Sequence, residues 1–221
     1  MKLSARTLHR VIALGLAAGL LALALPQSID ASMRLYAEAQ VAPSDVSSAP
    51  PAAAAIALLD TADRWFDDPE ARIDAGIAAF RRAYRSADEP DRAGMREAAR
   101  DFTSGLSRRP GDRWAWMYLA HADLAAGNAG AARDAFRTAI LVAPYDPDLS
   151  LWRTELGLYL WPELGADDRR LVAEQMETAW AEKPQNVLAL ANTPLAVAIL
   201  REGLVSSPTA LDAFDTALRR R

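Results

Sequence analysis

Apolar residues recur at intervals of three and four along the chain from Ala52 onward, and proline, glycine and acidic residues interrupt them frequently. This spacing is typical of amphipathic helices that bury one face. No alternation of apolar and polar residues persists long enough for a strand. The pattern therefore predicts an all-α domain over residues 53–221. We expect its helices at residues 53–66, 70–87, 91–108, 113–126, 129–142, 148–161, 167–182, 186–203 and 208–219.

Residues 1–40 have a different pattern, which predicts a membrane anchor or signal segment with a helical extension. Three basic residues, Lys2, Arg6 and Arg10, precede an uncharged run of 15 residues at 11–25. Two interpretations remain open, a retained membrane anchor and a cleaved signal peptide. The run is short for a membrane helix, and it contains small residues that suit a signal-peptide cleavage site. In both, the excess of positive charge before the run places the N-terminus in the cytoplasm and the rest of the chain outside.

Residues 41–52 are rich in proline, serine and alanine, a composition that favours neither helix nor sheet. We interpret them as a linker between the membrane segment and the helical domain. This arrangement predicts a single-pass protein of the inner membrane whose C-terminal domain faces the periplasm.

Two prolines, Pro110 and Pro144, stand 34 residues apart and enclose an ordered pattern of large and small side chains. The pattern comprises Trp116, Leu119 and Ala120 in a first helix, Gly127 at a turn, and Ala132, Phe136 and Ala139 in a second helix. Small residues allow two helices to approach closely, and the large rings fill the space between them. This unit resembles the tetratricopeptide repeat. The resemblance implies a right-handed solenoid of helix–turn–helix units, with Trp116 and Phe136 buried between paired helices.

The units on either side match the repeat less closely. Residues 98–110 have the second-helix pattern upstream, except that Gly105 replaces the last small alanine, and residues 176–184 have it loosely downstream. Within the best unit, Asp123 occupies a position at which the family has an aromatic residue. We expect its carboxylate to reach solvent or to pair with Arg133 or Arg137.

The wider layout has a second resemblance. A basic N-terminus, one apolar segment, a degenerate repeat domain and the stretch from Trp161 to Arg170 together resemble small membrane-anchored repeat proteins encoded with bacterial exopolysaccharide machinery. That resemblance implies a role in exopolysaccharide or cell-envelope assembly.

A candidate binding face lies on the first helix of the best repeat. At 100° per residue, Trp114, Met117, Tyr118 and His121 fall opposite the face that carries Trp116 and Leu119. In tetratricopeptide repeats this second face lines the concave groove, so we predict that these four residues bind a partner. Their chemistry suits an apolar or aromatic peptide, or a sugar ring that stacks on Trp114. The alternative is that a neighbouring helix covers them.

Few catalytic chemistries fit the composition. The chain has no cysteine and two histidines, and it lacks the glycine-rich loops that bind phosphates. A net charge of -4 gives no electrostatic signature for nucleic acid. Paired acids such as Asp167-Asp168 stand at helix starts, where they act as caps. We therefore expect no catalytic residue, no metal and no cofactor.

Two sets of arginines, Arg81, Arg82 and Arg85, then Arg92, Arg96 and Arg100, each form a basic helical face. Such a face is usually solvated, and the alternative is that it binds an anionic ligand or a lipid headgroup.

These observations predict a non-catalytic scaffold that holds another envelope or membrane protein. The aromatic face leaves a second hypothesis, a glycan-binding module that acts directly on a polysaccharide. An enzyme is a third hypothesis, and it would require two carboxylates close together in a pocket.

Overall fold

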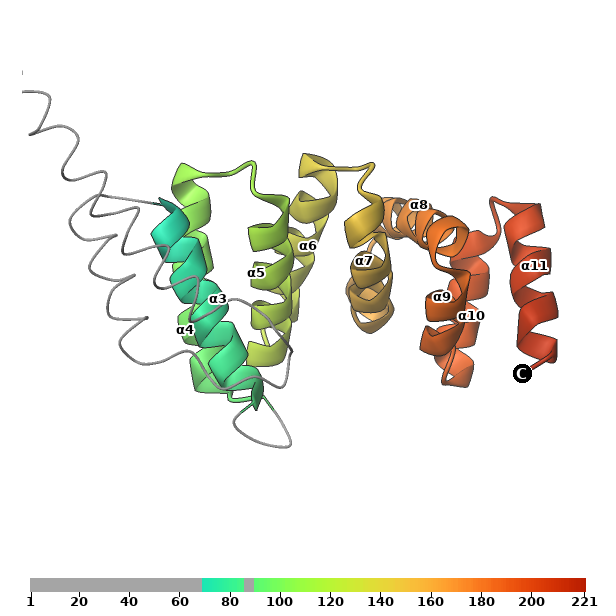
Figure 1. Cartoon of the computed structure of the whole chain (residues 1–221), viewed down its shortest axis with the longest axis horizontal. Helices are drawn as coiled ribbons and strands as arrows, with labels where there is room; N and C mark the ends of the chain where they lie inside the picture. Colours follow the sequence, from blue (N-terminus) through green and yellow to red (C-terminus); the bar gives the residue numbers. More distant parts are fainter. Residues whose placement is uncertain (1–68, 86–89) are drawn as a thin grey trace, which may run out of the picture.

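The computed structural model describes residues 69–85 and 90–221, and within these ranges it contains helices and no strand (Figure 1). The all-α prediction is confirmed for this part of the chain. The predicted membrane segment, the linker and the helix at 53–66 lie outside the described residues. The elements are α3 (Pro69–Arg85), α4 (Arg92–Arg108), α5 (Arg113–Ala126), α6 (Ala129–Val142), α7 (Pro147–Leu160), the 3₁₀ turn η1 (Trp161–Glu163), α8 (Ala166–Glu182), α9 (Pro184–Leu190), α10 (Pro194–Leu204) and α11 (Pro208–Arg219).

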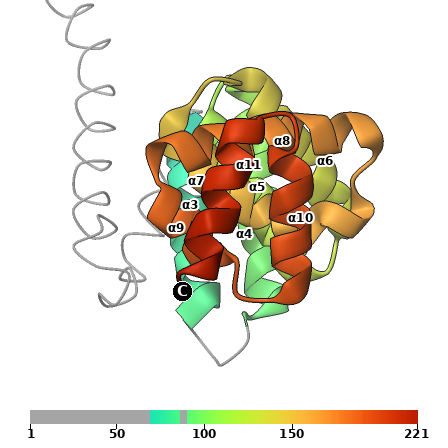
Figure 2. The same cartoon turned by 90° about the vertical axis from the view of Figure 1, so that its right-hand side faces the viewer.

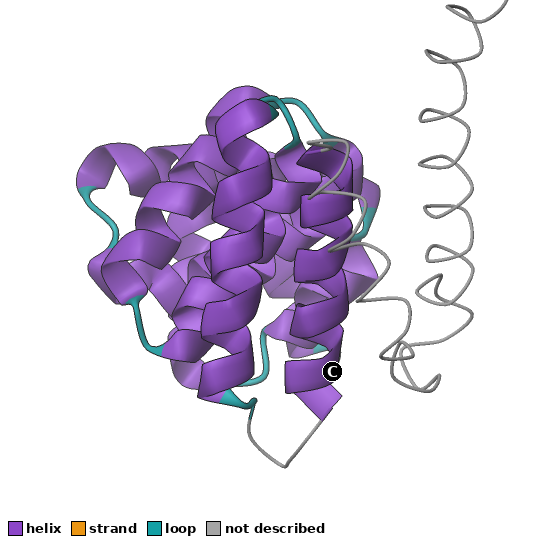
Figure 3. Ribbon diagram, turned by 90° about the vertical axis from the view of Figure 1, so that its left-hand side faces the viewer, coloured by secondary structure: helices purple, strands orange, loops and turns teal. Residues whose placement is uncertain are grey.

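The helices follow one another in chain order from α3 at one end of the described region to α11 at the other (Figure 1). The most extensive contacts join α3 to α4 and α5 to α6, and α4 also packs against α5. Beyond α6, the helix α8 contacts both α7 and α10. Figure 2 shows α10 and α11 at the C-terminal end, and Figure 3 shows the helices from the opposite end. None of the helices in the described ranges is both long enough and apolar enough to span a membrane.

Short polar side chains fix where several helices begin. The Asp112 carboxylate accepts hydrogen bonds from the backbone N–H groups of Trp114 and Ala115, which starts α5. The α5 helix ends at Gly127, whose φ of 90° lies in the left-handed region that favours glycine. These caps explain why α5 has the predicted bounds, 113–126, and α6 also has its predicted bounds, 129–142.

The helix predicted over 186–203 is wrong as a single element. It is divided into α9 and α10 by residues 191–193. Pro194 is the cause, because a proline disfavours helical geometry at the residue before it. Thr193 is accordingly extended, with φ -132° and ψ 154°, and its hydroxyl caps α10 by accepting a hydrogen bond from the Ala196 N–H.

The core contains the small and large residues that the repeat pattern selected. Ala132, Phe136 and Ala139 of α6 are all buried, which confirms the expected burial of Phe136. Trp116 is only partly buried, because its indole Nε1–H donates a 2.8 Å hydrogen bond to the Pro110 carbonyl at the start of the helix pair. The expectation that Trp116 fills the interior is therefore corrected.

Gly105 allows α3 and α4 to approach more closely than alanine would. A Cβ atom at this position would lie 2.6 Å from Cγ1 of Ile73 and 2.9 Å from the Pro69 carbonyl oxygen. Both distances are shorter than van der Waals contact. Glycine therefore replaces the alanine of the repeat pattern at this position for a steric reason.

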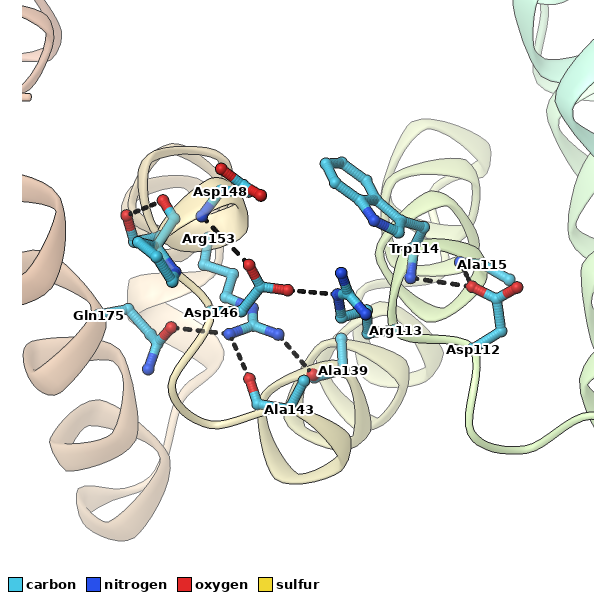
Figure 4. A network of polar contacts seen from close by, with 12 residues as sticks. Asp112, Arg113, Trp114, Ala115, Ala139, Ala143, Asp146, Asp148, Arg153 and Gln175 are labelled. Atoms are coloured by element: carbon cyan, nitrogen blue, oxygen red, sulfur yellow. Dashed lines mark hydrogen bonds and ion pairs between the residues drawn. The ribbon is translucent and has the colours of Figure 1, made fainter. Parts of the chain in front are cut away.

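A buried arginine joins α6, α7 and α8 (Figure 4). The Arg153 guanidinium of α7 donates to the carbonyls of Ala139 and Ala143, at the end of α6, over 2.7 and 2.8 Å. It also donates to Oε1 of Gln175 in α8 over 2.8 Å, and the Gln175 amide in turn donates to the Pro144 carbonyl. Burial lowers the pKa of Arg153, but an arginine stays charged in proteins. Its positive charge therefore lies at the negative end of the α6 dipole.

Replacing Arg153 with methionine is expected to destabilise the domain by about 2–5 kcal/mol. Methionine keeps much of the packing volume but leaves the carbonyls of Ala139 and Ala143 without a donor in the interior. Chemical denaturation monitored by circular dichroism measures the loss. Arg170→Met is the matched control, because the Arg170 side chain is exposed and its ion pair with Asp167 contributes little. Equal stability of the two variants would show that the guanidinium is not needed.

Candidate partner-binding face

Aromatic rings from three helices form a continuous row, which we call the aromatic row. In its centre, Tyr118 of α5 meets Trp152 of α7 edge to face, with ring centroids 5.0 Å apart. Trp114 and His121 contact the same Trp152 ring at 6.0 and 4.8 Å. Toward α3, Tyr118 also meets Phe80 at 5.4 Å, and Phe80 stacks with Tyr84 at 5.8 Å. The row thus connects α3, α5 and α7.

The row contains three of the four residues that the sequence placed in a binding groove. Trp114 is 41% exposed, and Tyr118 and His121 are partly buried by their ring contacts. Met117 is fully buried in the core. It therefore has no accessible surface for a partner, and its assignment to the groove is corrected. The reason is that α4 and α6 both pack against α5, and Met117 belongs to the core formed with them.

Sequence reasoning missed the members of the row outside α5. Phe80 and Tyr84 stand four residues apart on α3, a spacing that puts them on one helical face. That spacing could have identified them. Trp152 has no comparable signal, because only the tertiary structure brings α7 against the exposed side of α5.

A pocket lies further along α7 than the row. It has a volume of about 270 Å³ and lies between α7 and the connection from α9 to α10. Its lining is mixed: the aromatic residue Tyr159, apolar side chains that include Leu158, Leu190, Leu195 and Ile199, and the polar residues Glu155, Asn192 and Thr193. Tyr159 follows Trp152 by seven residues, which is about two helical turns, so both lie on the same side of α7. The pocket and the row therefore share one side of α7, and the apolar part of the pocket is large enough for a side chain.

His121 is held neutral within the row. Stacking against Trp152 buries most of the imidazole, and burial lowers its pKa from 6.5 to about 4. Its Nε2 atom has no hydrogen-bond partner among the described residues. The centre of the row is therefore uncharged at neutral pH, which suits contact with apolar or neutral groups.

Asp123 lies on the other side of α5 and does not behave as the sequence predicted. Its side chain is buried, and it accepts a hydrogen bond from the Asn128 side chain. Arg133 pairs with Asp134 instead, and Arg137 pairs with Asp168. Burial raises the pKa of Asp123, whereas the Asn128 hydrogen bond lowers it. The expected contact with solvent or arginine is thus replaced by a local amide contact.

Several acids of the described region serve as caps or ion-pair partners. Asp146 begins α7 by accepting the Asp148 N–H, and it also pairs with Arg113 of α5. Asp167 pairs with Arg170. No group of three or more potential metal ligands occurs among residues 69–85 and 90–221.

Comparison with known proteins adds no assignment, because no protein-family model, characterised protein or solved structure matches this chain.

The pKa of His121 predicts a loss of stability in mild acid. The unfolded chain protonates a histidine near pH 6.5, whereas the folded protein keeps His121 neutral down to about pH 4. A lowered folded-state pKa therefore stabilises the protein above pH 6.5, and this stability is lost as the pH falls. The expected loss between pH 7.5 and pH 5 is about 2 kcal/mol.

Urea denaturation at a series of pH values measures this effect. His121→Gln should remove most of the pH dependence above pH 5, where carboxylates titrate little. His9→Gln, which changes the other histidine of the chain, should leave it unchanged. The assignment would be refuted if both variants kept the dependence of the natural sequence.

Proposed function

We propose that this protein is a non-catalytic scaffold whose aromatic row binds a segment of another envelope or membrane protein. The observation that carries the proposal is the row itself, since its rings come from three helices and remain partly accessible. Tyr84 and Trp114 are 58% and 41% exposed at two places along it. Tryptophan and tyrosine dominate the binding energy of many interfaces, because they offer large rigid surfaces at little entropic cost.

The fold proposed for this scaffold is a right-handed solenoid of tetratricopeptide-like units. The pairing of α3 with α4, α5 with α6 and α7 with α8 supports it. So does the burial of Ala132, Phe136 and Ala139 at the positions that the repeat pattern selects. In such a stack the first helix of each pair lies on one side, and the aromatic row uses α3, α5 and α7 in this way.

The partner segment is expected to be apolar or aromatic and to carry little charge where it meets α5. The neutral His121 and the rings of Tyr118 and Trp152 present no charge for a polar ligand to pair with. The pocket beside Tyr159 can accept one apolar side chain of the same segment. A rigid surface of this kind binds without a large ordering cost.

The proposed location is the periplasmic side of the inner membrane, with residues 11–25 as the membrane segment and 41–52 as the linker. The basic residues before the apolar run support this orientation. A reporter enzyme that is active only outside the cytoplasm, fused after Arg221, should be active. The same fusion with residues 2–25 deleted is the control and should be inactive. Activity of both fusions, or of neither, would contradict the proposed topology.

A second candidate function is direct binding of a polysaccharide. The exposed ring of Trp114 favours it, because a sugar can stack on an accessible indole. Titration with envelope glycans while tryptophan fluorescence is recorded distinguishes the two functions. A saturable change that Trp114→Ala removes would favour the glycan module over the protein scaffold.

Photo-crosslinking in cells can identify the partner before any binding constant is measured. A photoreactive amino acid at Tyr84 or Tyr159, near the two ends of the surface, should give the same crosslinked protein. Tyr145 is the matched control position, since it is 92% exposed and lies between α6 and α7, outside the row. An identical product at Tyr145 would refute a specific role for the row.

Truncation of Trp114 to alanine is expected to weaken binding of the crosslinked partner by about 30- to 1000-fold. The melting temperature should change little, because much of this ring is already exposed. Tyr145→Ala should change neither quantity. A fall in melting temperature with unchanged affinity per folded molecule would show that Trp114 has a packing role instead.

A further inference from the structure

A second surface, which is charged and polar where the aromatic row is apolar, contains a pocket between α4 and the turn from α5 to α6. Its volume is about 560 Å³, and it is lined by Ala93, Arg96, Ala99, Arg100, Thr103, Asp123 and Asn128. This volume falls within the range of small-molecule sites and is far larger than a single inorganic anion needs. The pocket combines two cationic side chains with hydrogen-bonding groups.

The two arginines of this pocket have no protein partner among the described residues, although acids stand beside them in the sequence. Glu97 and Asp101 are the acids of α4, and both turn toward α3. Glu97 accepts from Arg82 over 2.9 Å, and Asp101 accepts from Arg72 over 3.1 Å. The guanidiniums of Arg96 and Arg100 are exposed and stand one helical turn apart, so their charges face the pocket without being neutralised.

The opposite wall supplies a hydrogen-bond acceptor. Asp123 is 9% exposed, and a hydrogen bond from the Asn128 side chain lowers the pKa of its carboxyl group, against the larger effect of burial, which raises it. A carboxylate can accept several hydrogen bonds, so acceptor sites remain on Asp123. Asn128 stands at the N-cap of α6 but makes no capping bond with its side chain. Its side chain lines the pocket together with Asp123.

We propose that this pocket binds a small anion that also carries hydroxyl groups, with a sugar phosphate or a sugar acid as its chemical class. Arg96 and Arg100 bind the phosphate or carboxylate, because guanidiniums pair with such groups through charge-assisted hydrogen bonds. Asp123 accepts a hydrogen bond from a hydroxyl of the ligand. The net charge of these three side chains is +1, which favours a monoanionic or dianionic ligand over a neutral sugar. This site is separate from the proposed scaffold function and does not depend on it.

Calorimetric titration of the full chain tests the site with four probes: glucose 6-phosphate, glucuronate, glucose and inorganic phosphate. The two sugar anions should bind, glucose should not, and inorganic phosphate should bind at least ten-fold more weakly than glucose 6-phosphate. Failure of both sugar anions to bind at about 10 mM would overturn the proposal. Equal affinity for phosphate and glucose 6-phosphate would also overturn it, because the hydroxyl contacts would then contribute nothing.

Three variants separate a defined site from a merely basic surface. The double variant Arg96→Gln/Arg100→Gln should lose at least ten-fold in affinity for glucose 6-phosphate. Arg92→Gln is the matched control, since Arg92 is exposed on the same helix one turn away but does not line the pocket. It should change affinity by less than two-fold. A ten-fold loss in Arg92→Gln would show that a diffuse positive charge binds the anion, and the site would be rejected.

Asp123→Asn tests the hydroxyl contact. It should weaken glucose 6-phosphate binding at least five-fold and should not weaken inorganic phosphate, which has no sugar hydroxyl. Equal weakening of the two probes, or no weakening of either, would remove Asp123 from the site. Melting temperatures measured on each variant confirm that it is folded. The double arginine variant changes exposed side chains alone, so the test does not depend on how well Asp123→Asn folds.

Discussion

The buried guanidinium of Arg153 is the constraint on which the arrangement of α6, α7 and α8 depends. A charge without water must find hydrogen-bond acceptors, and here they are the last carbonyls of α6 and the amide of Gln175 in α8. These bonds are directional, so they fix how α7 lies against both neighbours. Apolar packing alone constrains the orientation of a helix less, because the hydrophobic effect is non-directional.

The same junction determines the aromatic row. Trp152 precedes Arg153, and the rotation of about 100° between neighbouring helical residues turns it toward α5 while Arg153 enters the interior. Asp146 adds a second restraint, since it caps α7 and pairs with Arg113, the residue before Trp114. The Asp146–Arg113 ion pair and the rings around Trp152 therefore both join α7 to α5, next to the Arg153 network that joins α7 to α6 and α8. A change in the network is expected to reach the binding face.

The α5 helix separates two surfaces of opposite chemistry. His121 and Asp123 are two residues apart and so lie about 200° apart around its axis. Burial keeps His121 neutral among rings on one side, whereas Asp123 shares a pocket on the other side with Arg96 and Arg100, which have no ion-pair partner within residues 69–85 and 90–221. One helix can in this way position an apolar surface for a protein segment and a charged pocket for a small polar ligand.

Local sequence patterns were sufficient for the helical class and for most helix bounds, because caps and the three- to four-residue apolar spacing act within one element. They failed at 186–203, where the effect of Pro194 on its neighbour outweighed the apolar pattern. They also placed Met117 on an exposed face, whereas packing against the neighbouring helices buries it. Tertiary structure alone decided the rest. It brought Trp152 to Tyr118, Gln175 to Arg153 and Arg96 to Asp123, since each pair joins helices whose relative orientation no local pattern contains.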